Sequence, residues 1–583
     1  GLPRYLEGAR YFAQWAGMPY PVYGGYEGKN DMNDDINVRS RTVNYLAGKS
    51  LSNPTEEGLG IPFEMSMALH SDAGFSKEDE IIGTLGIYTT NFNNGRLHAG
   101  TDRHASRDLS DILLTQLQRD IRSTFNVDWT RRSLWHRNYS ETRLPAVPST
   151  IVELLSHQNF ADMRLGHDPN FKFTVGRALY KAILQYICSQ HGKDYVVQPL
   201  PVSHFAIRFG QKKNTLELSW QGEEDPLEPT AKPREYIVYT RIGRGGFDNG
   251  VRVSSPSHTV KIEPGIVYSF KVTAVNRGGE SFPSEILAAY KAKREKGQIL
   301  IVNGFDRISG PAVIDTPDAA GFDLSQDPGV PYLYDISLCG AQQNFSRKEA
   351  GRRLGESSDE YEGMKIIGNT FDYPFVHGKA IQAAGNYSFV SCSDEAVEKG
   401  ILSLEDYPIV DYILGLEKED NSSNPARNTY YKTFSSPMQR ILTSYCQSGG
   451  HLLVSGAYVG TDMDSSQGNK EFIQNILKYR HGNSLKTDGD KIAVRGLGHT
   501  FTLPRLPNEQ SYPVTSPDCI LPMSPAFPVM TYAIGNTPAA VAYQGSDYRT
   551  FVMGFPFESI REETSRNVIM ASILRFLTTD YTD

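Results

Sequence analysis

The sequence predicts a multidomain α/β protein in which a β-sandwich separates two α/β domains. Up to about residue 190, amphipathic helices alternate with apolar strands. Short alternating strands with turn residues follow, and after a charged linker, apolar strands alternate with helices again. The length of 583 residues suits about three or four domains of ordinary size. We therefore expect an α/β domain at 1–195, a β-sandwich at 198–293 and a second α/β domain at 297–583.

The composition excludes several classes of function. A hydrophobic content of 39% and a charged content of 22% are ordinary for globular domains. The net charge of −8, without a basic stripe, argues against a nucleic-acid partner. No run approaches the ~20 apolar residues that a membrane span needs. The cysteines are scattered, odd in number and without metal spacing, so we expect buried free thiols: Cys188, Cys339, Cys392, Cys446 and Cys519.

The N-terminal domain is predicted to contain three amphipathic helices. The first lies within residues 1–18 and ends at Gly17, and the others lie at 101–125 and 171–186. The apolar residues of the first helix recur at helical spacing: Leu6, Ala9, Phe12, Ala13 and Ala16.

Two apolar strands of this domain end in polar residues. The first, in FEMSMALHSDAGF, ends at His70, and the second, from Pro148 to Leu155, carries Glu153. A polar turn that contains His157 follows the second strand. Loops at strand ends carry many catalytic groups on rigid scaffolds. We therefore predict that His70 and Glu153 face one cleft at the same edge of an α/β sheet.

These motifs resemble those of the zinc-dependent N-acetylmuramoyl-L-alanine amidases, which are peptidoglycan hydrolases. MALHSDA is similar to the family's SLHADA-like strand end, which carries the third metal ligand, and IVELLSHQNFADM to the strand end that carries the catalytic glutamate. NDDINVRSRTVNYLAG resembles the family's D..L..R...AN element, with Asp35, Arg39 and Asn44 at the matching places. The resemblance covers about the first third of the chain. It implies that His70 binds zinc and that Glu153 is catalytic.

The chain departs from the family in its other zinc ligands. In the family a histidine, in a PGHGG-like first strand, and a glutamate precede the strand that matches the one with His70. No histidine occurs before His70 in this sequence. We therefore expect the sequence to be part of a longer parent that binds zinc, and we expect zinc to be weakly bound or absent in this part. Glu7 is a possible substitute ligand.

The resemblance implies metal-assisted amide hydrolysis. Zinc would polarise the lactyl carbonyl and lower the pKa of its water. Glu153 would take a proton from that water and pass it to the leaving L-alanine amine. Asp72 would orient His70 from behind, and Arg143 would bind a carboxylate of the stem peptide. His136 and His157 are further candidates for the lining of the site.

Purely structural roles remain open for the two central residues. A histidine that ends an apolar strand is often a hydrogen-bonded structural residue. Glu153 is equally placed to cap the following turn or to pair with Arg143 or Arg164.

The middle segment resembles a fibronectin type III domain. Its strands are NTLELSW, EYIVYTRI, HTVKI and VYSFKVTAVN, at sandwich spacing. Trp220 matches the core tryptophan of such domains and Tyr268 matches their corner tyrosine. The resemblance implies a spacer or a docking module.

The C-terminal segment resembles the class I glutamine-amidotransferase-like or flavodoxin-like group. Its strands include ILIVNGFDR, YPIVDYILG and HLLVSGAY, alternating with helices. The turn where working amidotransferases carry a cysteine has Ser455 here, and Cys446 lies in the preceding helix. No histidine follows near Glu558 to complete a triad. We therefore expect this domain to be noncatalytic.

The function that we expect is hydrolysis of the lactyl-L-alanine amide of peptidoglycan, in the periplasm or outside the cell. The partner would be peptidoglycan or another envelope glycan. One alternative is a polysaccharide lyase of the xanthan-degrading kind, for which Tyr139, Arg143 and His136 would surround a uronate. Another is a noncatalytic envelope scaffold.

Overall fold

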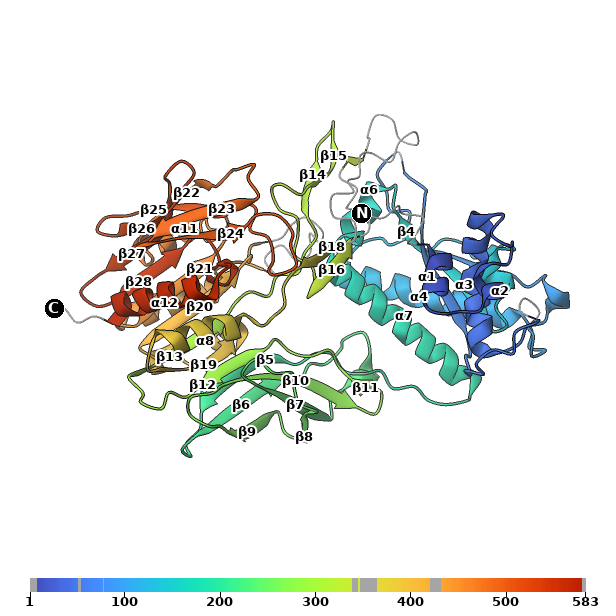
Figure 1. The fold of residues 1–583 in the computed structure, drawn as a ribbon, viewed down its shortest axis with the longest axis horizontal. Coiled ribbons are helices and arrows are strands. Elements are labelled where there is room, and N and C mark those ends of the chain that lie inside the picture. Colours follow the sequence, from blue (N-terminus) through green and yellow to red (C-terminus); the bar gives the residue numbers. More distant parts are fainter. Residues whose placement is uncertain are drawn as a thin grey trace. The chain divides into compact units, whose positions relative to one another are not determined.

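The computed structural model describes residues 8–50, 54–76, 78–337, 344–345, 364–419 and 431–578 (Figure 1). Glu7 and Cys339 lie outside the described residues. The chain is a mixed α/β protein of helices and several sheets, divided into two compact units. The first unit comprises Gly1–Tyr195, Val313–Phe322 and Cys339–Gly363, and the second comprises Val196–Ala312, Asp323–Leu338 and Met364–Asp583. Each unit is described by itself below.

The first unit is built on a four-stranded sheet in the order β1-β4-β2-β3. The strands that carry His70 and Glu153 are β1 (Ser66–Asp72) and β4 (Ser149–Ser156), and they run parallel. β2 (Leu85–Tyr88) runs antiparallel to β4. β3 (Trp135–His136) pairs with β2. β1 is therefore an edge strand of this sheet.

Two long helices, α4 (His104–Phe125) and α7 (Pro169–Gln190), pack against each other. α4 buries an i, i+4 stripe, Leu109, Leu113, Leu117 and Ile121, in one core with Val152 of β4. α7 begins after Asp168, whose side chain accepts a hydrogen bond from the Asn170 N–H, and Pro169 occupies its first turn. Both helices match predicted ones.

The smaller elements of the first unit surround this core. α1 (Ala9–Trp15) is shorter than the predicted first helix, and of its predicted apolar residues Ala13 is buried but Phe12 is exposed. The remaining elements are α2 (Tyr20–Tyr23), α3 (Asp31–Ala47), η2 (Asn93–Gly95), α5 (Ser140–Arg143), α6 (Phe160–Gly166), β14 (Ala312–Asp315), β15 (Ala320–Asp323) and β17 (Asn344–Phe345).

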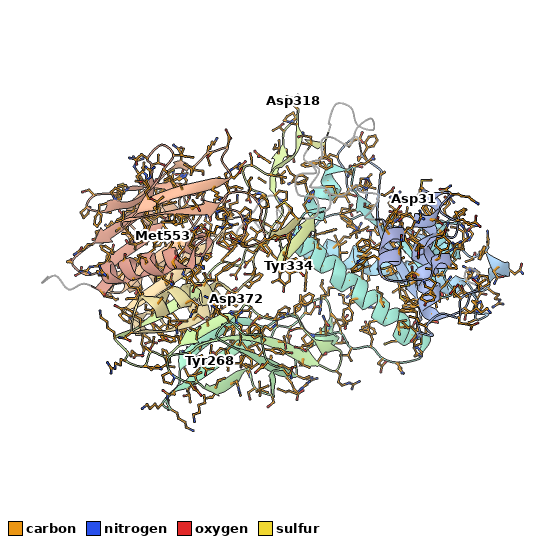
Figure 2. All side chains as sticks on the ribbon, in the orientation of Figure 1. Asp31, Tyr268, Asp318, Tyr334, Asp372 and Met553 are labelled. Carbon is orange, nitrogen blue, oxygen red and sulfur yellow. The ribbon has the colours of Figure 1, made fainter. Side chains whose placement is uncertain are left out.

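The second unit contains a β-sandwich. One sheet joins β5, β6 and β9, and the other joins β8, β7, β10 and β12. Trp220 of β6 lies between them, with its ring 5.4 Å from that of Tyr236 and 6.4 Å from that of Phe205. The hydroxyl of Tyr268 (Figure 2) accepts a hydrogen bond from the backbone N–H of Glu263 at 3.1 Å, the upstream contact expected of a corner tyrosine. The elements are β5 (Ser203–Phe209), β6 (Thr215–Gln221), η3 (Pro229–Ala231), β7 (Glu235–Ile242), β8 (Val251–Val253), β9 (Ser257–Lys261), β10 (Val267–Asn276), β11 (Gly279–Glu280) and β12 (Leu287–Tyr290).

The rest of the second unit is an α/β sheet in the order β19-β13-β20-β21-β28-β27-β26-β23-β24. The first five strands are parallel, and the chain visits β13, then β19 on one side of it, then β20 on the other. The elements are β13 (Gly297–Asn303), β19 (Tyr387–Ser393), β20 (Ile409–Gly415), β21 (His451–Gly456), β23 (Lys491–Gly496), β24 (His499–Pro504), β26 (Phe527–Tyr532), β27 (Pro538–Gln544) and β28 (Arg549–Met553).

Helices cover both faces of this sheet, as predicted. Alternate residues of β13 enter different cores: Leu300 and Val302 lie in one with α10, and Ile299 and Ile301 lie in the other with α8 and α12. The helices and remaining elements are β16 (Tyr334–Ser337), β18 (Met364–Ile367), α8 (Tyr373–Ala384), α9 (Asp394–Glu398), η4 (Leu404–Asp406), α10 (Ser436–Gln447), α11 (Gln467–Asn475), β22 (Tyr479–Ser484), β25 (Asp518–Pro522), η6 (Phe557–Ser559) and α12 (Glu563–Thr578).

The sandwich and the α/β sheet are tied together within the second unit. Arg241 of β7 makes two hydrogen bonds, of 2.6 and 2.7 Å, to the carboxylate of Asp372 at the start of α8 (Figure 2). One of the two cores also contains residues of both parts. Across the residues described in either unit, no helix has the length and apolar character needed to cross a bilayer.

Candidate functional site

His70 and Glu153 lie side by side in the first unit. β1 and β4 are parallel and in register, so that His70 is the partner of Glu153 across the sheet. The Nδ1 atom of His70 is 3.7 Å from Oε1 of Glu153. Both residues lie inside their strands, which continue to Asp72 and Ser156, and not at the ends where the sequence placed them. The pairing nevertheless brings the two predicted residues together.

A break in strand register follows this pair. Asp72 pairs with Ser156, so two residues of β4, Leu154 and Leu155, stand opposite the single residue Ser71. Such bulges re-aim side chains and are common beside active sites. Here the bulge lets both leucines line an open groove that follows β1.

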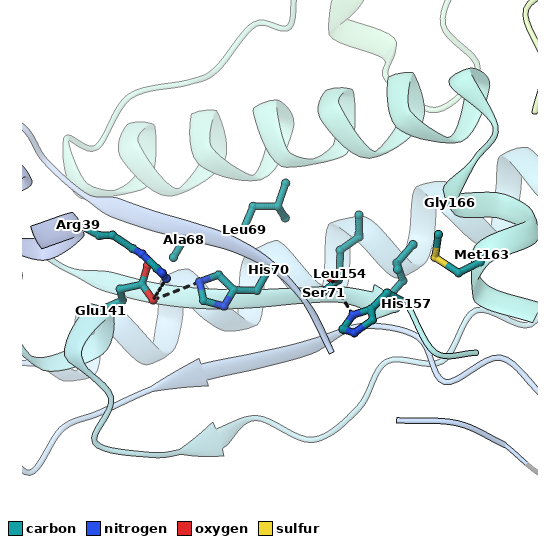
Figure 3. A pocket seen from close by; sticks show the side chains of 11 residues that line it. Arg39, Ala68, Leu69, His70, Ser71, Glu141, Leu154, His157, Met163 and Gly166 are labelled. Atoms are coloured by element: carbon teal, nitrogen blue, oxygen red, sulfur yellow. Dashed lines mark hydrogen bonds and ion pairs between the residues drawn. The ribbon is translucent and has the colours of Figure 1, made fainter. Parts of the chain in front are cut away.

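The groove has a volume of about 720 Å³. Figure 3 shows its polar lining, in which His70 points towards Glu141, and His157 lies beside Ser71. The lining residues are Arg39, Ala68, Leu69, His70, Ser71, Glu141, Leu154, Leu155, His157, Met163 and Gly166. Glu153 is not among them: it lies behind His70, with 15% of its side chain exposed.

Glu141 binds the second nitrogen of His70. Its Oε2 atom is 3.1 Å from Nε2 of His70, so the imidazole lies between two carboxylates. Arg39 of α3 approaches the same Oε2 atom at 3.6 Å and also pairs with Asp35 at 3.2 Å. The hydrogen bond to Glu141 raises the pKa of His70, with Glu153 adding to the effect and burial opposing it. His70 is therefore more readily protonated than an ordinary histidine.

Glu153 has the opposite kind of environment. Burial raises the pKa of its carboxyl group, the negative charges of Asp72 and Glu141 add to this, and His70 opposes it. Its Oε2 atom is buried and has no hydrogen-bond partner among the described residues. A carboxyl group with a raised pKa beside a titratable partner is typical of general acid–base sites.

Asp72 does not orient His70, contrary to the prediction. Its carboxylate pairs with Arg132 at 2.5 Å and accepts a hydrogen bond from the backbone N–H of Ala73 at 2.7 Å. Burial raises the pKa of Asp72, but these two hydrogen bonds outweigh it and leave the pKa below its usual value. Asp72 acts on the site by its charge, through Glu153.

Two other predicted residues also lie apart from His70. The Nε2 atom of His136 is engaged by Thr90, whose backbone N–H donates to it at 2.9 Å, and its ring packs on Tyr88. Arg143 donates to the carbonyl of Asn138 at 3.2 Å and is not among the residues that line the groove. The backbone N–H of Arg143 donates to the carbonyl of Tyr139 at 3.0 Å, and among the described residues no side-chain hydrogen bond or ring contact joins His136, Tyr139 and Arg143.

His157 is placed in the groove, as predicted. Its Nδ1 atom is 3.1 Å from the Ser71 hydroxyl, and its backbone N–H donates to the carbonyl of Asp72 at 3.0 Å.

The alternative partners proposed for Glu153 are engaged elsewhere: Arg143 donates to Asn138, and Arg164 pairs with Asp315 at 3.0 Å. Glu7 lies outside the described residues.

Glu141 and Arg132 were missed by the sequence analysis. Arg132 belongs to the run WTRRSLWHRNY, four residues before His136, and Glu141 lies only two residues before Arg143. α5, which carries Glu141, is four residues long. A helix of this length has no periodicity that a sequence pattern can detect.

Comparisons with known proteins assign no family. Neither a protein-family model nor a curated protein matches the sequence. Solved structures with partial similarity include a fibronectin type III domain from human, with 19% identity, 16% of this chain and 80% of that chain covered, and a TM-score of 0.15. Another is the rat CD45 extracellular region, domains d3–d4, with 17% identity, coverage of 16% and 49%, and a TM-score of 0.14. These TM-scores are too low to carry an argument about fold or function.

Proposed function

We propose that the groove along β1 is the catalytic site of a peptidoglycan amide hydrolase. The bond cleaved is the amide between the lactyl group and L-alanine, as the resemblance to N-acetylmuramoyl-L-alanine amidases implies. The observation that supports this proposal is the pairing of His70 with Glu153 on adjacent parallel strands, with Glu141 on the other side of the imidazole. An acid–base pair of this kind is what hydrolysis of an amide requires.

Glu153 is the proton carrier in this proposal. Its raised pKa suits a carboxylate that accepts a proton from the attacking water and returns it to the departing amine, and because Glu153 does not itself line the groove, the transfer would run through one bridging water. His70 stands between Glu153 and the groove. The hydrogen bond to Glu141 raises the pKa of His70, and the imidazole that lines the groove is placed to donate a hydrogen bond to the negative charge that develops on the carbonyl oxygen.

Zinc fits the described residues only in part. Nε2 of His70 and Oε2 of Glu141 are 3.1 Å apart, which suits two neighbouring ligands of one ion. A catalytic zinc site takes three protein ligands, and no third histidine, cysteine or carboxylate of the described chain converges with these two. The described residues therefore do not by themselves form a zinc-hydrolase site.

The other parts of the chain have supporting roles in the proposal. The sandwich serves as a fibronectin type III-like spacer or docking module, and the C-terminal α/β sheet takes no part in amide hydrolysis. The site of action is the cell envelope, in the periplasm or outside the cell, where the glycan substrate lies.

Replacement of Glu153 tests the proposal directly. Glu153→Gln keeps the shape of the side chain but removes its proton transfer, so we expect release of new amines from muropeptides to fall by about 10²- to 10⁴-fold. Glu57→Gln, at a side chain that is 88% exposed, is the matched control and should retain full activity. Full activity of Glu153→Gln would sink the proposal. Unsaturated, ultraviolet-absorbing sugars would indicate a lyase instead, and no turnover by the unmodified chain would indicate a scaffold.

Zinc content distinguishes the two central residues. We expect this chain to hold zinc weakly, because His70 and Glu141 offer two ligands. His70→Ala should remove the zinc that binds and the activity together, whereas Glu153→Gln should remove activity and leave zinc content unchanged. Calorimetric titration with zinc measures the binding, and release of new amines from muropeptides measures the activity. Stoichiometric zinc that survives His70→Ala would place the metal elsewhere and contradict this assignment.

A further inference from the structure

A second group of acidic side chains lies in the second unit, at the carboxyl ends of three parallel strands. β13 ends at Asn303, which is in register with Ser393 of β19 on one side and with Ile413 of β20 on the other. Because the chain passes from β13 to β19 and then crosses to β20, this is the point where the strand order reverses. In open α/β sheets, ligands bind in the crevice outside the strand ends at such a point.

Three carboxylates converge there. Asp306 follows β13, and Asp394 and Glu395 follow β19, and one oxygen of each lies within 4.8 Å of the others. All three side chains are half-buried. Ca²⁺ binds oxygen ligands at about 2.3–2.6 Å, so opposite ligands of one ion stand about 5 Å apart. The spacing of these oxygens is that of ligands around a single cation.

The charges of the three carboxylates are not balanced by ion pairs with described residues. Within the part of the chain that the structure describes, no lysine, arginine or histidine forms an ion pair with any of them. The nearby cations Arg307 and Lys418 both pair with Asp327, at 2.6 and 2.5 Å. Burial, followed by repulsion from Glu395, raises the pKa values of Asp306 and Asp394.

Asn303 provides an independent observation. Its side chain is fully buried, and its Nδ2 atom donates to Oε2 of Glu285 at 2.6 Å. The negative charge of Glu285 in turn adds to the rise in the pKa values of Asp306 and Asp394. The Oδ1 atom of Asn303 has no hydrogen-bond partner among the described residues. Buried amide oxygens are nearly always satisfied, so this acceptor points to a positively charged or donating group at the site.

Another carboxylate fixes the loop that carries Asp306. Oε2 of Glu417, which follows β20, accepts hydrogen bonds from the backbone N–H groups of Asp306 and Arg307, at 3.0 and 2.8 Å. These bonds hold the backbone after β13 in place and leave the Asp306 side chain free to face Asp394. The donor set is therefore positioned before any ion arrives.

We propose that Asp306, Asp394 and Glu395 bind a hard divalent cation of the Ca²⁺ or Mg²⁺ class, with Asn303 and Glu285 behind them. The donors are all oxygen atoms, which suits these ions and not zinc or copper. The thiol of Cys392 on β19 does not change this assignment, because it is buried in the core and is not one of the converging donors. The site is separate from the groove along β1 and does not depend on the function proposed for that groove.

Calorimetric titration of the whole chain, stripped with EDTA, tests the proposal. We expect one equivalent of Ca²⁺ or Mg²⁺ to bind and to raise the unfolding temperature. Asp394→Asn should weaken the binding at least about tenfold, because a ligand and its charge are lost. Asp547→Asn, at an exposed aspartate of the same unit, is the matched control and should bind as the unmodified chain does. His70→Ala should also bind normally, which separates this site from the groove.

A second measurement shows that the variant is folded. Without metal, Asp394→Asn should unfold at close to the temperature of the unmodified chain, because the amide oxygen can still accept the hydrogen bond that the Tyr412 hydroxyl donates to Asp394 at 3.3 Å. Two results would overturn the proposal. They are the absence of binding by Ca²⁺, Mg²⁺ and Mn²⁺ at millimolar concentrations, and unchanged binding in both Asp394→Asn and Asp306→Asn.

Discussion

At the scale of single residues, His377 of α8 shows how the second unit tolerates buried charge. The imidazole is fully buried, with Nδ1 2.8 Å from Asp411 and Nε2 3.2 Å from Glu558. Burial lowers its pKa, but the two carboxylates outweigh this and raise the pKa to about 9. Glu558 thus has a histidine partner after all, one that lies 181 residues away in the sequence. Ser455 does not complete a catalytic triad with His377 and Glu558, because the Ser455 hydroxyl is buried without a partner among the described residues.

The raised pKa of His377 predicts a pH dependence of stability. The folded pKa of about 9 lies above the ordinary value of 6.5, so the stabilisation is fully present below pH 6.5 and is lost as the pH rises through 9. The loss should be on the order of 3 kcal/mol. Denaturant unfolding from pH 6 to 10 measures it. His377→Gln should flatten the dependence, and His499→Gln, at an exposed histidine, should leave it unchanged.

A second prediction at this scale concerns the charge around Glu153. Asp72 raises the pKa of Glu153, and Arg132, its partner, lowers it. Asp72→Asn removes the negative charge that raises the pKa of Glu153, and it leaves the positive charge of Arg132, which lowers that pKa, without its partner. The acid limb of the pH–rate profile should therefore move to lower pH. Glu57→Gln is again the control. A profile that does not move would show that Glu153 does not control that limb.

At the scale of elements, a buried ion pair joins the two long helices of the first unit. Nζ of Lys181 on α7 is 2.6 Å from Asp120 on α4, and the two side chains are 1% and 3% exposed. Gln116 adds a hydrogen bond to Asp120 at 2.9 Å. Breaking such a pair from one side leaves a buried charge without compensation.

Lys181→Met should therefore destabilise the α4–α7 packing by about 3–5 kcal/mol. The double change Lys181→Met with Asp120→Leu should recover much of that loss, because no charge stays buried. Hydrogen exchange of the α4 and α7 amides reports the packing locally. If the double variant exchanged faster than the single one, the pair itself, and not the orphaned charge, would be the source of stability.

At the scale of the whole molecule, the second unit joins a sandwich and an α/β sheet through one core. That core contains Trp220 and Phe270 from the sandwich together with Val302 and Val410 from the parallel strands. Trp220→Ala should destabilise the unit by about 3–5 kcal/mol. Because the core is shared, amides of β6 and of β20 should lose protection together in hydrogen exchange. Faster exchange in the sandwich alone would show that the two parts unfold separately.

Local patterns in the sequence predicted the main helices and strands but not the contacts between residues that are distant in the sequence. The helices α4 and α7 and the strands around His70 and Glu153 carry strong periodicity, and parallel pairing then brings the two residues together. The contact between Glu141 and His70 could not be predicted, because a four-residue helix has no detectable period. The pairing of His377 with Glu558 and the order of β19, β13 and β20 depend on long-range topology, which short-range spacing does not encode.

The burial of β13 on both faces has a consequence for insertions and deletions. A slip of one residue would exchange Ile299 and Ile301 with Leu300 and Val302 between the two cores, and each face would remain apolar. Hydrophobicity therefore does not determine the register of this strand. The hydrogen bond from Asn303 to Glu285 does, because a slip would carry the amide away from its carboxylate. An insertion or deletion of one residue within β13 would thus leave the sheet well packed but break the hydrogen bond between Asn303 and Glu285 at the end of the strand.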